Sequence, residues 1–439
     1  MMRSLVGNWR QPIFFYFDCP MRKTLLFEII DYIQNEGFYV CGLVSDLGGS
    51  NRALHKSLGV DLEKTWFWNT QQHTIFVFAD VPHLLKLIRN NFLDYGFVLN
   101  GKEIKKSLII KLLELTETDL RISYEITMDN LTVKGPQRQK VKLAAKLFSH
   151  TISQAIERCG KICHFQEDEP WKECSVFFKQ VNNWRDCFNT RVPESDSRDR
   201  VKAFGLALDT QQDIVDKMTN TISEMKVIGK SSLMPFQKGI IQSNTALKLM
   251  YQDLNERFGL KYILTYRLKQ DILENFFASI RAKDGLYDHP DPVDFRYRLR
   301  NQILGRNYGT LSEGCNAEDD YRQGPNVEEN VLLSGKCLSA LSEDNDSVEN
   351  YSIPTVEEDI DDLHHDSLEH LGGYICKRLN INEPSTSSNT WTDQLSEGGL
   401  IKPSEEFLKN IKKLEDIFND FNDGSLKISK NYLKSLLDL

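Results

Sequence analysis

The stretch "FYVCGLVSD", residues 38–46, decides the fold, because it is a run of aromatic and β-branched residues that ends in an aspartate. Such a run, followed by two glycines, predicts a buried β-strand. A second run of the same kind, "HTIFVFAD" at residues 73–80, also ends in an aspartate. Ligands of open α/β sheets bind at the carboxyl ends of strands, so Asp46 and Asp80 are candidate functional residues.

Asp46 has a second interpretation. It precedes "LGGSN", and an aspartate before Gly-Gly is ordinary turn chemistry. The local sequence alone does not separate a metal ligand from the first residue of a turn.

The segments around these runs alternate between strand and helix. "PIFFYFD" (Pro12–Asp18) predicts a further strand, and "KTLLFEIIDYIQNEG" (residues 23–37) predicts a helix from the spacing of its apolar residues. Another helix follows Asp80, with leucines along one side. This order predicts an α/β domain over residues 1–100.

Helical patterns dominate the next two hundred residues. "QKVKLAAKLFSHTISQAIERC" (139–159) and "CSVFFKQVNNWRDCFNTRV" (174–192) fall within a predicted helical region over residues 101–232. Helices are also predicted in "MPFQKGIIQSNTALKLMYQDLNERFG" (234–259) and "YILTYRLKQDILENFFASIRAKDG" (262–285), within a unit over residues 233–305. In the last of these, Asp271 and Glu274 lie one turn apart on a common side.

Charge and composition bound the function. The net charge is −9 and the pI about 5.6, so any nucleic-acid surface must be local. Between Leu311 and His370 there are 17 Asp or Glu and two Lys or Arg, which predicts a disordered acidic linker over residues 306–365. A helical remnant is expected over residues 366–439. A basic set for a DNA path comprises Lys86, Arg89, Arg281, Lys283, Arg296, Arg298 and Arg300.

Nine scattered cysteines and the lack of any long apolar run predict a reduced cytosolic or nuclear protein without a membrane span. The tightest metal-type cluster, Cys159, Cys163, His164 and Cys174, lacks the paired C-x-x-C elements of structural zinc sites.

The carboxylates fit polynucleotidyl transfer. That chemistry needs about three carboxylates around two divalent metal ions, which hold the attacking and leaving oxygens of a phosphoryl displacement. Mg2+ prefers oxygen ligands and keeps several waters. Asp46 at a strand end and Glu274 on a helix could supply two of these carboxylates.

Several blocks resemble the P element transposase family and its THAP-domain relatives. The blocks occur in the family's order over roughly residues 3–305: "VGNWRQPIFFYF", "LVSDLGGSN", "FADVPHLLKLIRNN", "LAAKLFS", "WRDCFN" and "LKQDILENFFASIRAKDG". "GGYICKRL" and "GGLIKPS" extend the resemblance toward the C-terminus. The resemblance implies an RNase H-like catalytic fold, interrupted by an α-helical insertion that binds GTP.

The resemblance also assigns residues. It implies that Asp46 and Glu274 are catalytic ligands of Mg2+, and that Asp80 and His83 form a D-x-x-H signature. It further implies that three residues bind GTP, namely Asp186, Asn189 and Asp271, with a lysine that the sequence does not choose among Lys134, Lys140 and Lys142.

The structural alternatives stay open at this point. Asp186 and Asn189 could be an ordinary pair on a helix face, His83 a capping residue, and Asp271 a solvated neighbour of Glu274.

A P-loop would be the obvious alternative nucleotide site, and "VIGKSSL" contains its Gly-Lys-Ser ending. The loop needs a glycine five places before Gly229, but that position is Glu224, whose carboxylate would face the phosphates. An aspartate that accepts hydrogen bonds from guanine N–H groups is a sounder use of Asp186.

The chain as written departs from the family at its start. The family's first catalytic aspartate belongs on a strand before "VGNW", and its zinc finger also precedes that block. We therefore expect an RNase H-like sheet that is incomplete at its N-terminus, and a catalytically incomplete protein.

Two main hypotheses follow. The first is a GTP-dependent DNA transposase, or a part of one, that acts on transposon ends in the nucleus and could form a homo-oligomer. The second is a domesticated, non-catalytic nuclear regulator that binds DNA or protein. A stand-alone guanine-nucleotide binder is a third.

Overall fold

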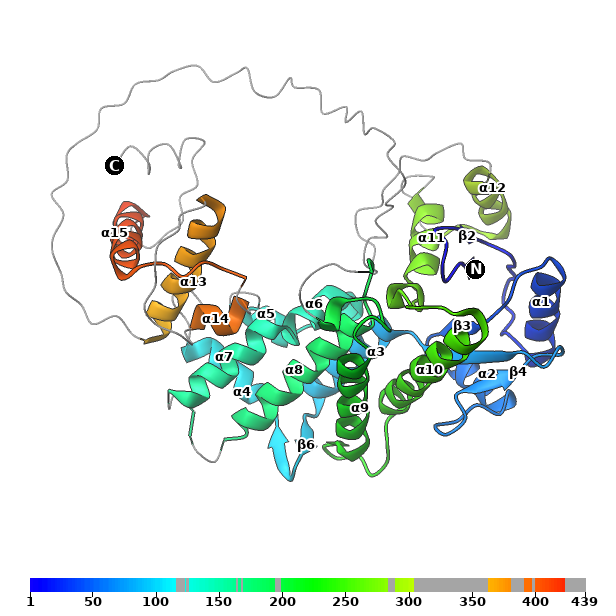
Figure 1. The fold of residues 1–439 in the computed structure, drawn as a ribbon, viewed down its shortest axis with the longest axis horizontal. Helices are drawn as coiled ribbons and strands as arrows, with labels where there is room; N and C mark the ends of the chain where they lie inside the picture. Colours follow the sequence, from blue (N-terminus) through cyan, green and yellow to red (C-terminus); the bar gives the residue numbers. More distant parts are fainter. Residues whose placement is uncertain are drawn as a thin grey trace, which may run out of the picture.

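The computed structural model describes residues 1–115, 123, 126–162, 165–166, 169–193, 199–282, 289–303, 362–379, 391–396 and 399–422. The predicted acidic linker therefore lies outside the described residues from 306 to 361. Cys163 and His164, two members of the zinc-type cluster, and Lys283 of the basic set also lie outside them. Figure 1 shows the arrangement of the described helices and strands.

A three-stranded sheet carries the two candidate aspartates. Its order is β3 (Gly42–Ser45), β5 (Thr74–Ala79) and β4 (Trp66–Trp68), with β3 parallel and β4 antiparallel to β5. The strands predicted from residues 38–46 and 73–80 are confirmed, with the first shortened at its start. Ser45 pairs with Ala79, so Asp46 and Asp80 follow at the same edge of the sheet.

Both faces of this sheet are covered. Ile75 and Val77 point to one side, where they pack with Leu26 and Ile30 of α1 (Lys23–Asn35) and with Leu54 of α2 (Gly49–Ser57). The alternate residues, such as Phe76 and Phe78, belong to the larger core on the other side. A strand buried on both faces explains the unbroken apolar run of β5.

Helix α10 (Pro235–Phe258) crosses the second face of the sheet (Figure 1). Its Ser243 hydroxyl exchanges hydrogen bonds with the backbone of Ala79, and Gln242 Nε2 donates to the carbonyl of Val77. A Cβ at Gly239 would lie 2.8 Å from Leu84, on helix α3 (Val81–Asp94), so this close approach requires glycine. The polar side chains thus hold α10 against the middle strand at a fixed register.

The strand predicted over Pro12–Asp18 is not formed. The neighbouring strand, Arg10–Gln11 (β2), ends just before this segment and pairs with Met2–Arg3 (β1). Phe15 and Phe17 instead pack their rings against Phe295 of α12 (Pro292–Ile303), at 5.4 and 5.7 Å. The aromatic composition that predicted a strand is therefore used for ring contacts with a helix.

A second small sheet brackets the helical region. Its order is β7 (Lys102–Ile104), β6 (Phe97–Leu99) and β8 (Lys226–Val227), so the chain returns beside β6 after more than a hundred residues. Buried phenylalanines, including Phe92, Phe97 and Phe148, connect this sheet to the helices. The intervening helices are α4 (Lys106–Leu115), α5 (Met128–Leu131), η1 (Gly135–Gln139), α6 (Val141–Leu147), α7 (His150–Lys161), α8 (Trp171–Cys187), η2 (Asp199–Val201) and α9 (Leu208–Glu224).

The helix predicted from residue 262 begins later, at Asp271. It is α11 (Asp271–Arg281), preceded by a short 3-10 turn, η3 (Thr265–Arg267). Ile263 makes an isolated bridge with Phe204, and the Thr265 hydroxyl donates to the carbonyl of Cys187 at 2.7 Å. These tertiary contacts hold residues 263–267 in a non-α-helical conformation despite their apolar spacing.

The C-terminal helices lie against the helical region. They are α13 (Asp362–Leu379), α14 (Trp391–Ser396) and α15 (Glu405–Asn422), drawn in orange and red in Figure 1. Arg158 of α7 donates to both carboxylate oxygens of the buried Asp366, at 2.5 and 3.2 Å. In the described part of the chain, no helix is both long and apolar enough to cross a membrane.

Candidate active centre and nucleotide site

Asp46 lies between the end of β3 and the start of α2. Its Oδ1 accepts hydrogen bonds from the Gly48 backbone amide at 2.8 Å and from Asn51 Nδ2 at 2.7 Å. Asp46 is therefore a turn residue with a fixed, partly exposed side chain. Oδ2 accepts no hydrogen bond from the described residues, so one oxygen holds the turn and the other is available to a ligand.

Asp80 has a structural role. It is 2% exposed, and one carboxylate oxygen caps α3 by accepting from the His83 backbone amide at 3.0 Å. The other oxygen accepts from the Gln270 amide at 2.8 Å, just before α11 begins. The Asp80 amide itself donates to the Ser45 carbonyl at 2.9 Å. Asp80 thus joins β3, α3 and α11 at one point.

Glu274 lies on α11, one turn after its start, and is partly buried. Burial raises the pKa of its carboxyl, and the negative charges of Asp80 and Asp46 raise it further, while the positive charges of Lys86 and Arg281 lower it. The backbone amide of Gln270, four residues before Glu274, donates to the Asp80 carboxylate at 2.8 Å. The fold therefore brings Glu274 to the sheet edge that carries Asp46 and Asp80.

His83 lies in the same group of side chains. We call Asp46, Asp80, His83 and Glu274 the strand-end centre. Burial lowers the pKa of its imidazole, Lys86 lowers it further, and Asp80 and Asp46 act in the opposite direction. Its backbone amide takes part in the cap of α3. His83 therefore combines a capping position with a side chain that is more readily neutral than an exposed histidine.

Asp46 and Glu274 suit Mg2+ as a partial ligand set. Mg2+ often binds through one or two carboxylates and takes its other ligands from water and phosphate. Within the residues that the structure describes, no three or more His, Cys, Asp or Glu side chains are grouped as metal ligands. The available geometry thus offers two carboxylates, with Asp80 occupied by backbone amides.

The predicted nucleotide residues lie at the end of α8. The Asp186 carboxylate accepts from Arg185 Nη2 at 2.9 Å, from Arg200 Nε at 3.2 Å and from Asn182 Nδ2 at 3.1 Å. The Asn189 amide donates to the Asp186 carbonyl at 3.0 Å, so the two residues share one tight turn. The guanidinium groups of Arg185 and Arg200 therefore occupy the Asp186 carboxylate, and a guanine base would have to displace one of them.

Lys269 connects this cluster to α11. Its Nζ donates to Asn189 Oδ1 at 2.6 Å, and Lys269 is 6% exposed. Asp271, two residues later, is the first residue of α11 and is 8% exposed. The segment from 269 to 274 therefore runs from the nucleotide cluster to Glu274 within little more than one helical turn.

Two lysines lie next to the predicted site residues without having been predicted as part of either site. The Lys269 ammonium donates to the Asn189 side chain. The family resemblance implied instead that a lysine among Lys134, Lys140 and Lys142 contacts the nucleotide. Lys86 was grouped with a surface basic set, but it is buried at the strand-end centre. A usable signal was the three-residue spacing of Asp80, His83 and Lys86, which places them on one side of a helix.

Part of the predicted basic set is structural. Arg89 is fully buried, and its guanidinium donates to the carbonyls of Lys140 and Arg138 and to Asn90 Oδ1. Arg298 is 3% exposed, and its Nη1 donates to the carbonyls of Ile280 and Arg281 at the end of α11. Neither guanidinium lies on a DNA path; Arg281, Arg296 and Arg300 remain exposed.

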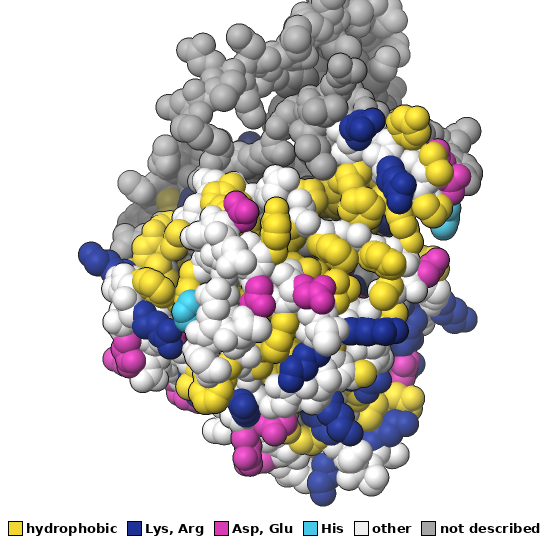
Figure 2. Space-filling view, turned by 90° about the vertical axis from the view of Figure 1, so that its right-hand side faces the viewer, with side chains coloured by type: hydrophobic (Ala, Val, Ile, Leu, Met, Phe, Trp, Pro, Cys, Tyr) yellow, Lys and Arg dark blue, Asp and Glu magenta, His cyan; other side chains and the backbone are white. Residues whose placement is uncertain are grey.

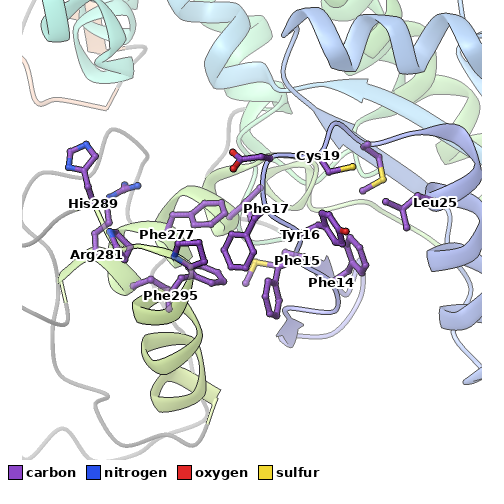
Figure 3. Close-up of a pocket in the computed structure, with 17 residues that line it drawn as sticks. Phe14, Phe15, Tyr16, Phe17, Cys19, Leu25, Phe277, Arg281, His289 and Phe295 are labelled. Carbon is purple, nitrogen blue, oxygen red and sulfur yellow. The ribbon is translucent and has the colours of Figure 1, made fainter.

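An aromatic groove lies on the other side of α11 (Figure 3). It encloses about 880 Å3, and Phe277 and Arg281 of α11 face Phe15 and Phe17 across it. Figure 2, which views this side of the molecule, shows hydrophobic side chains gathered across the face. Glu274 is not among the lining residues, so the groove and the carboxylate centre use different sides of one helix.

Comparison with known proteins shows which family the chain resembles. Residues 82–200 match the family described as "TNP-like, GTP-binding insertion domain". The chain is 37% identical over 455 residues to the transposable element P transposase of Drosophila melanogaster, covering all of this chain and 59% of the relative. The solved structure of the Drosophila P element transposase strand transfer complex aligns with a TM-score of 0.67 and 40% identity, covering 70% of this chain and 69% of that one.

A mixed α/β chain with a GTP-binding type of insertion defines a transposase-like protein. The chain belongs to the P element transposase family, as the sequence blocks predicted. It spans 59% of the length of the curated relative.

Proposed function

We propose that the chain is a DNA-binding, transposase-like protein in which Asp46 and Glu274 bind Mg2+ and the helical insertion binds GTP. The observation that carries this proposal is that the Gln270 amide bonds to Asp80, which brings α11 with Glu274 to the sheet edge that carries Asp46. The match of residues 82–200 to a GTP-binding insertion domain supports the nucleotide part. The RNase H-like fold and the boundaries at residues 100, 232 and 305 remain predictions.

The protein groups divide the work at the strand-end centre. Bound Mg2+ would act as a Lewis acid toward a phosphodiester. Asp46 offers Oδ2 in a fixed direction because Gly48 and Asn51 hold Oδ1. Asp80 sets the position of α11, and hence of Glu274, through the Gln270 amide. A divalent cation would also favour the ionised form of Glu274, whose pKa burial raises.

Guanine recognition would use acceptors at the end of α8. A carboxylate accepts from the two N–H groups of guanine and cannot do so from adenine, which lacks them in that pattern. Asp186 supplies such a carboxylate once Arg185 or Arg200 moves aside. Asn189 and Asp271 would complete the site from the neighbouring turn and the start of α11.

The partners follow as part of the same proposal. DNA at transposon ends is the expected nucleic acid, the nucleus the expected location and a homo-oligomer the expected assembly. The relative's structure is described as a strand transfer complex, which supports DNA as the partner class.

A second candidate function is a nuclear regulator that binds DNA or protein without cutting. It is favoured by one observation: among the described residues, Asp46 and Glu274 find no third carboxylate free to complete a metal site. The two candidates share nucleotide binding and differ in catalysis.

Two assays test these proposals. Unlabelled GTP, but not ATP, should displace a fluorescent GTP from the protein. Asp186→Ala should lower the affinity for GTP at least tenfold. Asp213→Ala, an exposed position on α9, is the matched control. Equal GTP and ATP competition would contradict the nucleotide assignment. Mg2+-dependent nicking of duplex DNA that Glu274→Gln abolishes would favour the transposase, and binding without nicking would favour the regulator.

A further inference from the structure

Lys86 has a buried stem, and its ammonium has no hydrogen-bond or ion-pair partner among the described residues. The residue is 6% exposed, although lysines are almost never fully buried unless they are paired. Its ammonium forms no hydrogen bond and no ion pair with any residue that the structure describes. Its Nζ is not among the enclosed polar atoms that lack a hydrogen-bond partner, so the ammonium reaches the surface, where an anion can bind it.

Arg89, one turn further along α3, shows what a structural cation looks like in the same helix. Its guanidinium donates to two backbone carbonyls and one side-chain oxygen, so its donors are used internally. Lys86 has no such acceptors. Both side chains pack within the protein, but only the donors of Arg89 are used there.

The charge of Lys86 lies beside the strand-end centre. Lys86 lies on α3 one turn after His83, and its charge lowers the pKa of both Glu274 and His83. It nevertheless stays outside ion-pairing distance of Glu274. A phosphate bound by this ammonium would therefore lie beside the Asp46 and Glu274 carboxylates.

We propose that Lys86 binds a non-bridging oxygen of a DNA backbone phosphate and positions that phosphate at the Asp46–Glu274 carboxylates. This inference rests on the proposed function. A lysine ammonium is a compact point charge that suits phosphate oxygens. Lys86 is thus a positioning residue for the phosphodiester, distinct from the Mg2+ ligands.

The competing explanation is internal. Lys86 could serve only to offset the negative charges of Asp46, Asp80 and Glu274 within the protein. The two explanations differ in the salt dependence of DNA binding, because only a phosphate contact releases a counterion from DNA.

The experiment measures binding of a labelled double-stranded DNA oligonucleotide to the full chain by fluorescence anisotropy, across a series of salt concentrations without Mg2+. Lys86→Met keeps the buried stem and removes the charge. It should lower affinity by roughly five- to tenfold near 0.1 M salt and reduce the slope of log K against log salt by about 0.9. Lys217→Met, at an exposed lysine on α9, should change neither.

Lys86→Arg keeps the charge and should retain the wild-type slope, which guards against a folding defect in the first variant. An unchanged slope in Lys86→Met, or a reduced slope in Lys86→Arg, would overturn the inference and leave the proposed function standing. Failure of the unmodified chain to bind DNA at all would overturn the proposed function, and the inference with it.

Discussion

The two candidate sites treat their charges in opposite ways. In the nucleotide cluster, the Asp186 carboxylate accepts hydrogen bonds from Arg185, Arg200 and Asn182. Asn189 accepts one from Lys269. In the strand-end centre, Glu274 and Lys86 form no ion pair with the described residues, and Asp46 leaves one oxygen unused.

This difference predicts how each site responds to a ligand. A satisfied cluster is stable by itself and binds a ligand by exchange, so its own arginines compete with the base. An unsatisfied centre keeps the negative charges of Asp46, Asp80 and Glu274 close together at a cost in stability, which a bound cation would offset. The nucleotide cluster should therefore select its ligand, and the strand-end centre should gain stability from one.

The largest effect is expected where the strand-end centre is anchored. Asp80→Ala removes a helix cap and leaves the Gln270 amide without its acceptor, so the free energy of unfolding should fall by about 3 kcal/mol. Chemical denaturation measures this. Asp80→Asn keeps one acceptor oxygen and should lose about half as much; equal and small losses in both variants would show that Asp80 is not an anchor.

The anchoring role of Asp80 illustrates what the sequence could predict. The runs at 38–46 and 73–80 located both strand ends, because burial on two faces leaves a strong apolar signal. The sequence could not show that Asp80 would point inward to backbone amides while Asp46 stays partly exposed. That difference depends on where α11 packs, which is a long-range contact.

The wrong predictions have the same origin. Pro12–Asp18 has strand composition but finds ring contacts on α12 instead of a partner strand. Arg89 and Arg298 were predicted as surface cations, yet each donates hydrogen bonds to backbone carbonyls at a helix terminus or loop. The residue type shows which interactions these side chains can make. Which partners they find depends on how elements distant in the sequence pack together.

The link between the two sites gives the next prediction. Lys269→Met removes the bond to Asn189 and keeps the buried stem, so unfolding should become easier by about 1.5–2 kcal/mol. Because Lys269 lies two residues before Asp271, GTP affinity should fall as well. Calorimetry of both unfolding and GTP binding tests this, with Lys261→Met on the exposed approach to the same segment as control. Unchanged GTP affinity would separate Lys269 from the nucleotide site.

A sharper test of the exchange model uses Arg200. Its guanidinium donates to Asp186 Oδ2, which guanine would need. Arg200→Gln should therefore raise GTP affinity about threefold, equivalent to roughly 0.7 kcal/mol, while leaving ATP affinity low. Competition with fluorescent GTP measures the change. A loss of affinity would mean that Arg200 contacts the nucleotide itself, and the model of internal competition would be wrong.

The smallest effect concerns Glu274, whose pKa is raised by burial and by the charges of Asp80 and Asp46. The native state then holds its proton more tightly than the unfolded state, so wild-type stability falls as pH rises through the raised pKa. Glu274→Gln has no carboxyl to ionise. At neutral pH it should be more stable than the wild type by less than about 1 kcal/mol, since the partly exposed site is screened, and the difference should vanish below the ordinary glutamate pKa.

Mg2+ should reverse this order at neutral pH, because it stabilises the ionised carboxylate of the wild type and has one ligand fewer in Glu274→Gln. Thermal melting with and without Mg2+ across pH measures both effects, and Glu256→Gln on an exposed turn of α10 is the control. If Mg2+ stabilised both proteins equally, the cation would bind elsewhere. The crowded charges at the strand ends would then be a feature of the fold alone, and the contrast with the nucleotide cluster would carry no information about metal binding.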